Sequence, residues 1–140
     1  MADTFKFQLI TPTGVVFDGV AEQVTAKGPL GEFGVLAAHT DFITSLVPGL
    51  LEAKQSGGAM KNWVVSGGLA EVRSGEMTVL AGAADAPETI DANSAAREEQ
   101  AADEALSQKS FYDPDYAAAS EALQLARARN QAASGKPAAH

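Results

Sequence analysis

The fold of this chain is decided by residues 63–81, which read WVVSGGLAEVRSGEMTVLA. Two β-prone runs, residues 63–65 and 76–80, flank a third short segment, and Gly67-Gly68 and Ser74-Gly75 separate the three. Glycine marks turns because it reaches backbone conformations that are closed to residues with a Cβ atom. The stretch therefore predicts consecutive short strands joined by tight turns.

The same pattern extends toward the N-terminus. Two segments alternate apolar and polar residues with the period of a half-buried strand, one through Phe5, Phe7 and Leu9 and the other through Val20, Glu22, Val24 and Ala26. Further turn signals are Thr13-Gly14, Asp18-Gly19, Pro48-Gly49 and Gly57-Gly58. A spacing of roughly ten residues predicts that residues 1–86 form an antiparallel β-sandwich or barrel.

The composition changes near Pro87. Twelve of the thirteen glycines lie in residues 1–86, whereas residues 92–139 contain sixteen alanines, which favour helix. Residues 87–131 are predicted to form a two-helix antiparallel hairpin, with Asp91 as the N-cap of the first helix and Asp113-Pro114 at the start of the second. Residues 132–140 are predicted to be a flexible tail.

The overall composition excludes several classes of function. The 140 residues carry a formal net charge of -8, which argues against nucleic acid as a partner. The absence of cysteine excludes thiolate metal sites, disulfides and cysteine nucleophiles. Residues 1–6 do not resemble a signal peptide, and no apolar run approaches the ~18 residues of a membrane span. Membrane association is therefore expected only indirectly, through other proteins.

His39 is the first residue to consider for catalysis or metal binding, since Thr40 and Asp41 follow it. Catalysis would also need a nucleophile, and a metal would need three or four ligands. The only other histidine is His140. We interpret His39 as a loop histidine that hydrogen-bonds or contacts a partner. A small hydrolase that uses His39 and Asp41 is kept as an alternative.

Two further patterns invite a catalytic or phosphate-binding interpretation. Ser66 stands before two glycines, but a nucleophile elbow needs Gly-x-Ser-x-Gly, and position 64 is valine. Residues 28–34 space three glycines as a phosphate-binding loop does, but they run into a Phe-Gly-Val-Leu sequence instead of Gly-Lys-Ser/Thr. We interpret Ser66 as a turn serine and the glycines as a tight loop, and we predict a non-catalytic protein with no metal site.

Arg127 and Arg129, together with Lys136, form a small basic end on an acidic protein. Two interpretations stay open. Cations are favourable near a helix C-terminus, where the helix dipole is negative. The same residues could instead contact acidic residues on a partner.

Several motifs, taken in order, resemble one family. They are Gly31-Glu32-Phe33-Gly34-Val35-Leu36 with His39, Leu46-Val47-Pro48-Gly49, Ser66-Gly67-Gly68-Leu69-Ala70-Glu71-Val72, Thr78-Val79-Leu80-Ala81, Ile90-Asp91 and Asp115-Tyr116-Ala117. Their order and spacing across residues 4–130 are similar to those of the epsilon subunit of bacterial F-type ATP synthases, which is homologous to the mitochondrial delta subunit.

The resemblance implies an α+β protein, with a ten-stranded N-terminal β-sandwich followed by a C-terminal helical hairpin. It implies a non-catalytic rotor subunit of the central stalk that links the gamma subunit to the c-ring and couples rotation to proton transport. The protein is then expected as a peripheral protein at the cytoplasmic face of the bacterial inner membrane. A free-standing β-sandwich binding module is the alternative.

The resemblance also implies roles for particular residues. The c-ring contact is expected in a loop made of Gly31, Glu32, Phe33 and Gly34, and a gamma contact at His39. Regulatory contacts of the hairpin, including contacts with alpha and beta subunits, are expected at Asp91, Arg97, Arg127 and Arg129.

The resemblance includes an ATP-binding motif, Ile/Leu-Asp-x-x-Arg, that this chain departs from. Asp91 is present, but Ser94 stands where the arginine is expected, and Arg97 follows three residues later. A charge-assisted hydrogen bond to a phosphate is worth about 1.5–3 kcal/mol, so its loss predicts weak or no ATP binding and no cofactor. Since few basic residues lie on the second helix, weak inhibition of ATP hydrolysis by the hairpin is also expected.

Overall fold

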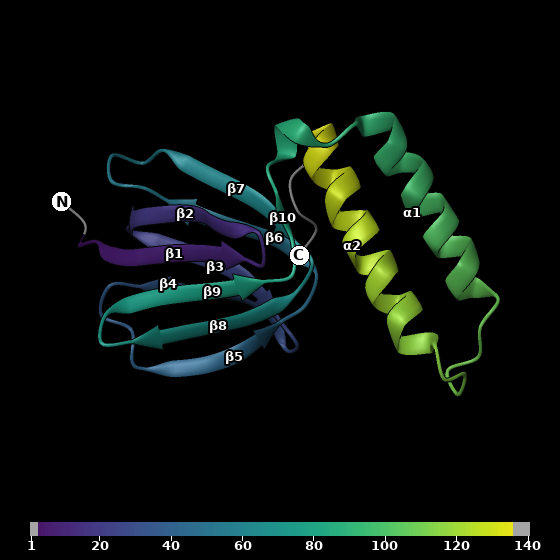
Figure 1. The fold of residues 1–140 in the computed structure, drawn as a ribbon, viewed down its shortest axis with the longest axis horizontal. Coiled ribbons are helices and arrows are strands. Elements are labelled where there is room, and N and C mark those ends of the chain that lie inside the picture. Colours follow the sequence, from purple (N-terminus) through teal and green to yellow (C-terminus); the bar gives the residue numbers. More distant parts are fainter. Residues whose placement is uncertain (1–2, 136–140) are drawn as a thin grey trace.

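The structure, a computed structural model, describes residues 3–135 and contains ten strands and two α-helices (Figure 1). Sheet A has the strand order β2-β1-β9-β8-β5, and sheet B has the order β10-β7-β6-β3-β4. The strands of sheet A are β1 (Phe5–Thr11), β2 (Gly14–Ala21), β5 (Phe42–Leu46), β8 (Gly68–Arg73) and β9 (Glu76–Ala81). Those of sheet B are β3 (Gln23–Gly28), β4 (Gly31–Leu36), β6 (Gly49–Lys54), β7 (Met60–Val65) and β10 (Ala84–Asp85).

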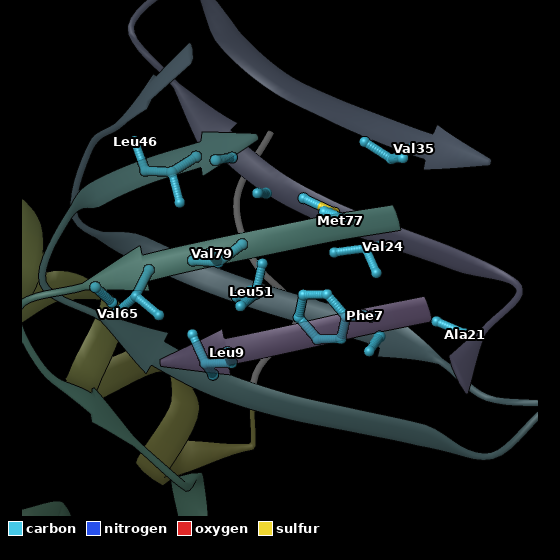
Figure 2. Packing of buried hydrophobic residues seen from close by; sticks show 14 of the residues in the cluster. Phe7, Leu9, Ala21, Val24, Val35, Leu46, Leu51, Val65, Met77 and Val79 are labelled. Carbon is cyan, nitrogen blue, oxygen red and sulfur yellow. The ribbon is translucent and has the colours of Figure 1, made fainter. Parts of the chain in front are cut away.

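The two sheets pack face to face around one apolar core, which confirms the sandwich and rules out the barrel. Phe7, Leu9 and Leu51 are fully buried between the sheets (Figure 2). The Phe7 ring lies 5.6 Å from the ring of Phe17 and 6.3 Å from that of Trp63, centroid to centroid. Such close-packed interiors deform little, so the sandwich is a stiff body.

The alternation predicted for β1 is confirmed, because Phe5, Phe7 and Leu9 are all buried. The second alternation, from residue 20 to residue 26, is wrong at its start. β2 ends at Ala21 and β3 begins at Gln23, so the period is broken between them. Ala21 faces the core, and Val20 is exposed on the other face of sheet A.

The strands are antiparallel with one exception, since β1 and β9 pair in parallel. A hairpin turn forces its two strands to be antiparallel, but β1 and β9 are separated by most of the domain. Their relative direction is therefore set by the tertiary packing of the domain and not by a turn. Sheet A is mixed, because it contains one parallel and three antiparallel strand pairs.

The predicted turn at Asp18-Gly19 is wrong, because both residues lie inside β2. A Cβ atom on Gly19 would come within 3.0 Å of the Phe17 ring, so the glycine makes room for that aromatic side chain. The predicted break between strands at Gly67-Gly68 is confirmed, since β7 ends at Val65, although Gly68 is already the first residue of β8. There, a Cβ atom on Gly68 would lie 2.0 Å from the carbonyl oxygen of Leu80, a separation that no side chain allows.

After a short 3-10 helix, η1 (Pro87–Thr89), the chain forms α1 (Ala92–Ser107) and α2 (Tyr116–Ser134). Asp91 is the N-cap of α1, as predicted: its Oδ2 atom accepts a hydrogen bond from the Ser94 N–H at 2.9 Å. Asp113 is not the cap of α2. Its carboxylate accepts from the Ser110 N–H at 2.8 Å inside the connecting turn, and Asp115 takes the N-cap position.

The second helix is longer than predicted. It continues to Ser134 and ends at Gly135, whose left-handed φ of 70° closes the helix. Residues 132–134, predicted to belong to the tail, are therefore helical, while residues 136–140 of that tail lie outside the described residues.

The hairpin is folded down against sheet B. Val64 of β7, Ile90 and Ala95 form a second, small apolar cluster. Leu125 and Ala128 of α2 pack against this cluster, and α2 contacts β6 and β7 (Figure 1). The outer face of sheet B is thus partly covered by α2, whereas the outer face of sheet A is not covered by the hairpin.

Candidate protein-interaction surfaces

A row of exposed apolar side chains crosses four strands of sheet A. Val15 is the Cα partner of Ile10, Ile10 is the partner of Leu80, and Leu80 is the partner of Leu69. We call these four residues the apolar row. Val15 is 61% exposed, Leu80 48% and Leu69 37%, while Ile10 is half-buried. Contiguous apolar surface of this kind marks interaction sites on soluble proteins.

No motif of the sequence predicts the apolar row, although the sequence carries a signal for it. Leu9-Ile10 and Val79-Leu80 are pairs of adjacent apolar residues within predicted strands. Since successive side chains of a strand point to opposite faces, such pairs make both faces of the sheet apolar. Only the register of the four strands reveals that the outward members lie side by side.

The segment Gly31–Gly34, predicted to be a loop, is part of strand β4. Gly28 and Gly31 are Cα partners in the β3–β4 ladder, so the turn consists of Pro29 and Leu30 alone. Gly31 has a φ of 124°, which residues with a Cβ atom rarely adopt. Leu30 is fully exposed at this turn. Gly28 therefore ends β3 and Gly31 begins β4, on the two sides of a tight turn. The glycines do not form a phosphate-binding loop.

His39 lies beyond the opposite end of β4, in the connection to β5. Its Nδ1 atom lies 2.9 Å from the carbonyl oxygen of Thr40, and its ring lies 4.8 Å from that of Phe42. The Phe42 ring in turn contacts Phe33 edge-to-face at 5.9 Å. His39 is thus an exposed loop histidine with a hydrogen bond, as interpreted from the sequence, and its ring packs against the Phe42 ring.

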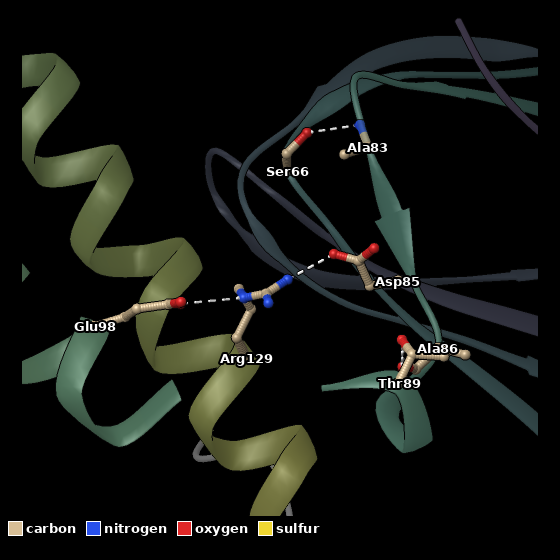
Figure 3. A network of polar contacts seen from close by, with 7 residues as sticks. All are labelled: Ser66, Ala83, Asp85, Ala86, Thr89, Glu98 and Arg129. Carbon is tan, nitrogen blue, oxygen red and sulfur yellow. Dashed lines mark hydrogen bonds and ion pairs between the residues drawn. The ribbon is translucent and has the colours of Figure 1, made fainter. Parts of the chain in front are cut away.

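The candidate catalytic residues are all occupied in structural roles. Asp41 accepts a hydrogen bond from the Ser74 N–H at 2.9 Å, which ties the β4–β5 connection to the β8–β9 turn. The Ser66 hydroxyl oxygen accepts from the Ala83 N–H at 2.9 Å (Figure 3). His39 and Asp41 do not form a pair in these contacts, so the geometry does not support a hydrolase.

Arg129 joins the hairpin to the sandwich. Its Nη1 atom donates to Asp85 of β10 at 2.6 Å, and its Nε atom lies 3.4 Å from Glu98 of α1 (Figure 3). One guanidinium group therefore bridges α2, α1 and the edge of sheet B. We call these three residues the Arg129 bridge. The sequence predicted a role for Arg129 but not for its two acidic partners, which lie far from it along the chain.

Arg127 also has a partner within the chain, since its Nε atom lies 3.7 Å from Glu99 of α1. The suggested placement of these arginines near a helix C-terminus is wrong, because α2 continues to Ser134 and has no basic residue in its last turn. Lys136, the third member of the basic end, lies outside the described residues. Arg127, Lys27 and Glu32 line a groove of about 470 Å³ between α2 and sheet B.

The start of α1 brings Asp91, Ser94 and Arg97 together. Hydrogen bonds from the backbone N–H and then the side chain of Ser94 lower the pKa of the Asp91 carboxyl group, and the charge of Arg97 adds to this effect. The Arg97 Nη2 atom lies 3.3 Å from the Ser94 hydroxyl oxygen. Asp91 therefore serves as a helix cap, and Arg97 is held beside it on an exposed surface.

The described residues 3–135 contain no group of three or more acidic or histidine side chains arranged to hold a metal ion. Within the same residues, neither α1 nor α2 is long and apolar enough to cross a membrane. The open apolar row and the docked hairpin together favour the class of proteins that work by binding other proteins.

Comparisons with known proteins identify the family. Residues 4–87 match the profile described as "ATP synthase, Delta/Epsilon chain, beta-sandwich domain". An ATP synthase epsilon chain of Bradyrhizobium sp. (strain BTAi1) is 36% identical over 114 residues, which cover 81% of this chain and 84% of the relative. An epsilon chain of Desulfosudis oleivorans is 44% identical over 91 residues, 65% of this chain and 68% of the relative.

The structure is also similar to a chain in the Euglena gracilis mitochondrial ATP synthase assembly described as "OSCP/F1/c-ring". The TM-score is 0.75 at 28% sequence identity, over 86% of this chain and 76% of that one. The chain belongs to the delta/epsilon family of ATP synthase subunits. It is a non-catalytic rotor subunit of the central stalk, associated with the membrane through the complex. Neither the hydrolase nor the free-standing binding module is correct.

Proposed function

We propose that the sandwich links the gamma subunit to the c-ring, with gamma bound to the outer face of sheet A. The observation that carries this proposal is the apolar row, which the hairpin leaves open. The buried cores of stable protein interfaces are enriched in apolar side chains. The row supplies such a core across four neighbouring strands of sheet A, toward the end of the sheet where β1 and β9 finish.

We propose that the second contact, with the c-ring, is made by the β3–β4 hairpin. Leu30 is fully exposed at its turn, and Glu32 follows on β4. His39, proposed as a gamma contact, lies beyond the other end of the same strand. A strand of six residues spans roughly 17–20 Å. Two different partners can therefore occupy its two ends at once, and a stiff sandwich between them can transmit torque.

The gamma contact is tested by Leu80→Glu, which places a charge in the apolar row. Burying a leucine is worth about 1.5–3 kcal/mol, so we expect gamma binding to weaken by at least tenfold in a titration with purified gamma subunit. Ser56→Glu, on the exposed β6–β7 turn, adds the same charge away from sheet A and should bind normally. Equal affinities of the two variants would refute the assignment.

The c-ring contact can be tested by cross-linking, because the chain contains no cysteine. A single Glu32→Cys substitution should form a cross-link to a c subunit in the assembled enzyme, whereas Ser56→Cys should not. A Glu32→Cys variant that assembles with gamma but forms no cross-link to the c-ring would contradict the contact and leave the gamma assignment intact.

We also propose that the hairpin binds ATP weakly or not at all. Ser94 cannot supply the positive charge that the family motif places there, and Asp91 is engaged as the cap of α1. A direct titration that gives micromolar affinity would disprove this. The hairpin is likewise proposed to inhibit hydrolysis only weakly. Deletion of residues 88–140 should leave the ATPase activity of the assembled motor nearly unchanged, and a several-fold rise would contradict it.

The contact of the hairpin with alpha and beta subunits, and the position of the protein at the cytoplasmic face of the bacterial inner membrane, are proposed from the family alone. Protease treatment of inverted and right-side-out membrane vesicles tests the second point. The chain should be digested only where the cytoplasmic face is outside.

A further inference from the structure

The turn that joins α1 to α2, residues 108–115, carries two exposed aromatic side chains. We call it the hairpin tip. Phe111 is 75% exposed and Tyr112 is 90% exposed. The Phe111 ring packs edge-to-face on Tyr112 at 5.8 Å and against Tyr116 at 5.4 Å. In Figure 1 this turn lies at the end of the hairpin away from η1, projecting from the body of the molecule.

The hairpin tip is a well-defined structure held by polar contacts. The Asp113 carboxylate accepts from the Ser110 N–H at 2.8 Å, and the Asp113 N–H donates back to the Ser110 carbonyl oxygen at 2.9 Å. The Lys109 ammonium group lies 2.7 Å from the Asp115 carboxylate. These bonds close the turn on both sides of the aromatic pair. The turn therefore holds the two rings outward. All the other Phe, Tyr and Trp side chains are buried at least in part.

The segment of chain that carries the rings is acidic. Residues 103–121 contain five acidic side chains and one basic side chain, Lys109, which is already paired with Asp115. An acidic surface is attracted to a basic one and repelled by anionic lipid head groups. The charge therefore favours a basic protein surface over a membrane.

We propose that the hairpin tip is a docking site for a protein surface with an apolar pocket rimmed by Lys or Arg side chains. Interface hot spots are enriched in aromatic residues that fill such pockets. Phe111 and Tyr112 are the anchors, and the acidic residues around them select the basic rim. This site is separate from both proposed contacts of the sandwich, so it does not depend on them.

The test uses the full chain in the assembled ATP synthase complex. A photo-cross-linking amino acid, p-benzoylphenylalanine, replaces Tyr112. It should form one dominant cross-link, to a peptide that contains both apolar and Lys or Arg residues. The matched control places the same amino acid at Ala101, an exposed position on α1. An absent cross-link at position 112, or the same products from both positions, would overturn the proposal.

Two further measurements test the proposed chemistry. The cross-link yield should fall several-fold when the salt concentration rises from about 0.05 to about 0.5 M, because screening weakens the contact with the basic rim. Phe111→Ser in the cross-linker variant should reduce the yield at least tenfold while the far-ultraviolet circular dichroism stays unchanged. A salt-independent yield, an unaffected yield in the serine variant, or co-sedimentation of the chain with anionic phospholipid vesicles would each contradict it.

Discussion

The sandwich encloses Phe7, Leu9 and Leu51 completely between two sheets, whereas the hairpin rests on sheet B through one small cluster around Val64 and Ile90. The Arg129 bridge adds a polar attachment. Loss of an element from the sandwich would therefore expose a continuous core, whereas undocking of the hairpin from sheet B would expose only the small cluster.

This difference matches the needs of a rotor subunit. The proposed role of the sandwich, to transmit torque between two neighbours, requires a part that keeps its shape, and a close-packed sandwich does so. An element that changes position has to be only marginally stable in each of them. Phe111 and Tyr112, the largest side chains of the connecting turn, are exposed at the tip and do not anchor the hairpin.

The largest expected effect is in the sandwich core. Phe7→Ala leaves a cavity next to Phe17 and Trp63, and such substitutions cost about 3–5 kcal/mol of unfolding free energy. Urea unfolding followed by the fluorescence of Trp63, the single tryptophan, measures the loss. Phe111→Ala removes the same side chain at the hairpin tip and should leave the midpoint unchanged. A similar loss in both variants would erase the difference between the two regions.

A smaller, local effect is expected at the junction. Ile90 is buried in the cluster under α2. Ile90→Ala should therefore lower the stability by about 2–5 kcal/mol, mainly by weakening the docking of the hairpin on sheet B. Amide hydrogen exchange should become faster in α1 and α2, while the amides of β1 and β9 keep their protection. Equal acceleration in the helices and the core strands would show that the two regions unfold together.

The Arg129 bridge should contribute less. The Arg129 side chain is half-buried, and its partners Asp85 and Glu98 are more exposed. Ion pairs of this kind contribute roughly 0.2–1 kcal/mol to stability. Arg129→Gln should slightly accelerate hydrogen exchange in α2, and the difference from wild type should shrink in high salt. Arg127→Gln is the matched control and should have a still smaller effect, because the Arg127 contact with Glu99 is longer and Arg127 is more exposed than Arg129.

The smallest expected effect is the titration of the α1 cap. Because the folded-state pKa of Asp91 is lowered, its contribution to stability is present above its unfolded pKa of about 3.9 and is lost as the pH falls through the folded value. The helical circular dichroism of the hairpin should therefore weaken below about pH 4. Asp91→Asn keeps a good cap without a titrating group, so the difference between the two proteins isolates this residue. Superimposable pH curves would contradict the assignment.

Much of the fold could be predicted from local patterns, and the failures have local explanations. The break between strands at Gly67-Gly68 and the cap at Asp91 were predicted correctly because each depends on a few adjacent residues. The turn at Asp18-Gly19 was wrong because the same dipeptide also fits inside a strand where Phe17 needs space. The cap of α2 was misplaced because Asp113 and Asp115 both precede the helix, and only the turn geometry selects between them.

The interaction surfaces were less predictable than the fold. The residues of the β3–β4 segment and His39 were expected to contact partners from the family resemblance, and their contacts stay predictions. The apolar row and the acidic partners of Arg129 were not anticipated, because no local motif marks them. Each is a set of residues from separate elements, brought together by strand register or by docking.

By itself, the sequence determined the division of the chain into a strand-rich part and a helical part, since glycine and alanine act on the backbone within a few residues. It also determined the family, through motifs read in order along the chain. The tertiary structure alone decided that β1 runs parallel to β9, that four apolar side chains meet on the open face of sheet A, and that Arg129 reaches Asp85. These features depend on contacts between residues far apart in the chain, which form only when the whole core closes.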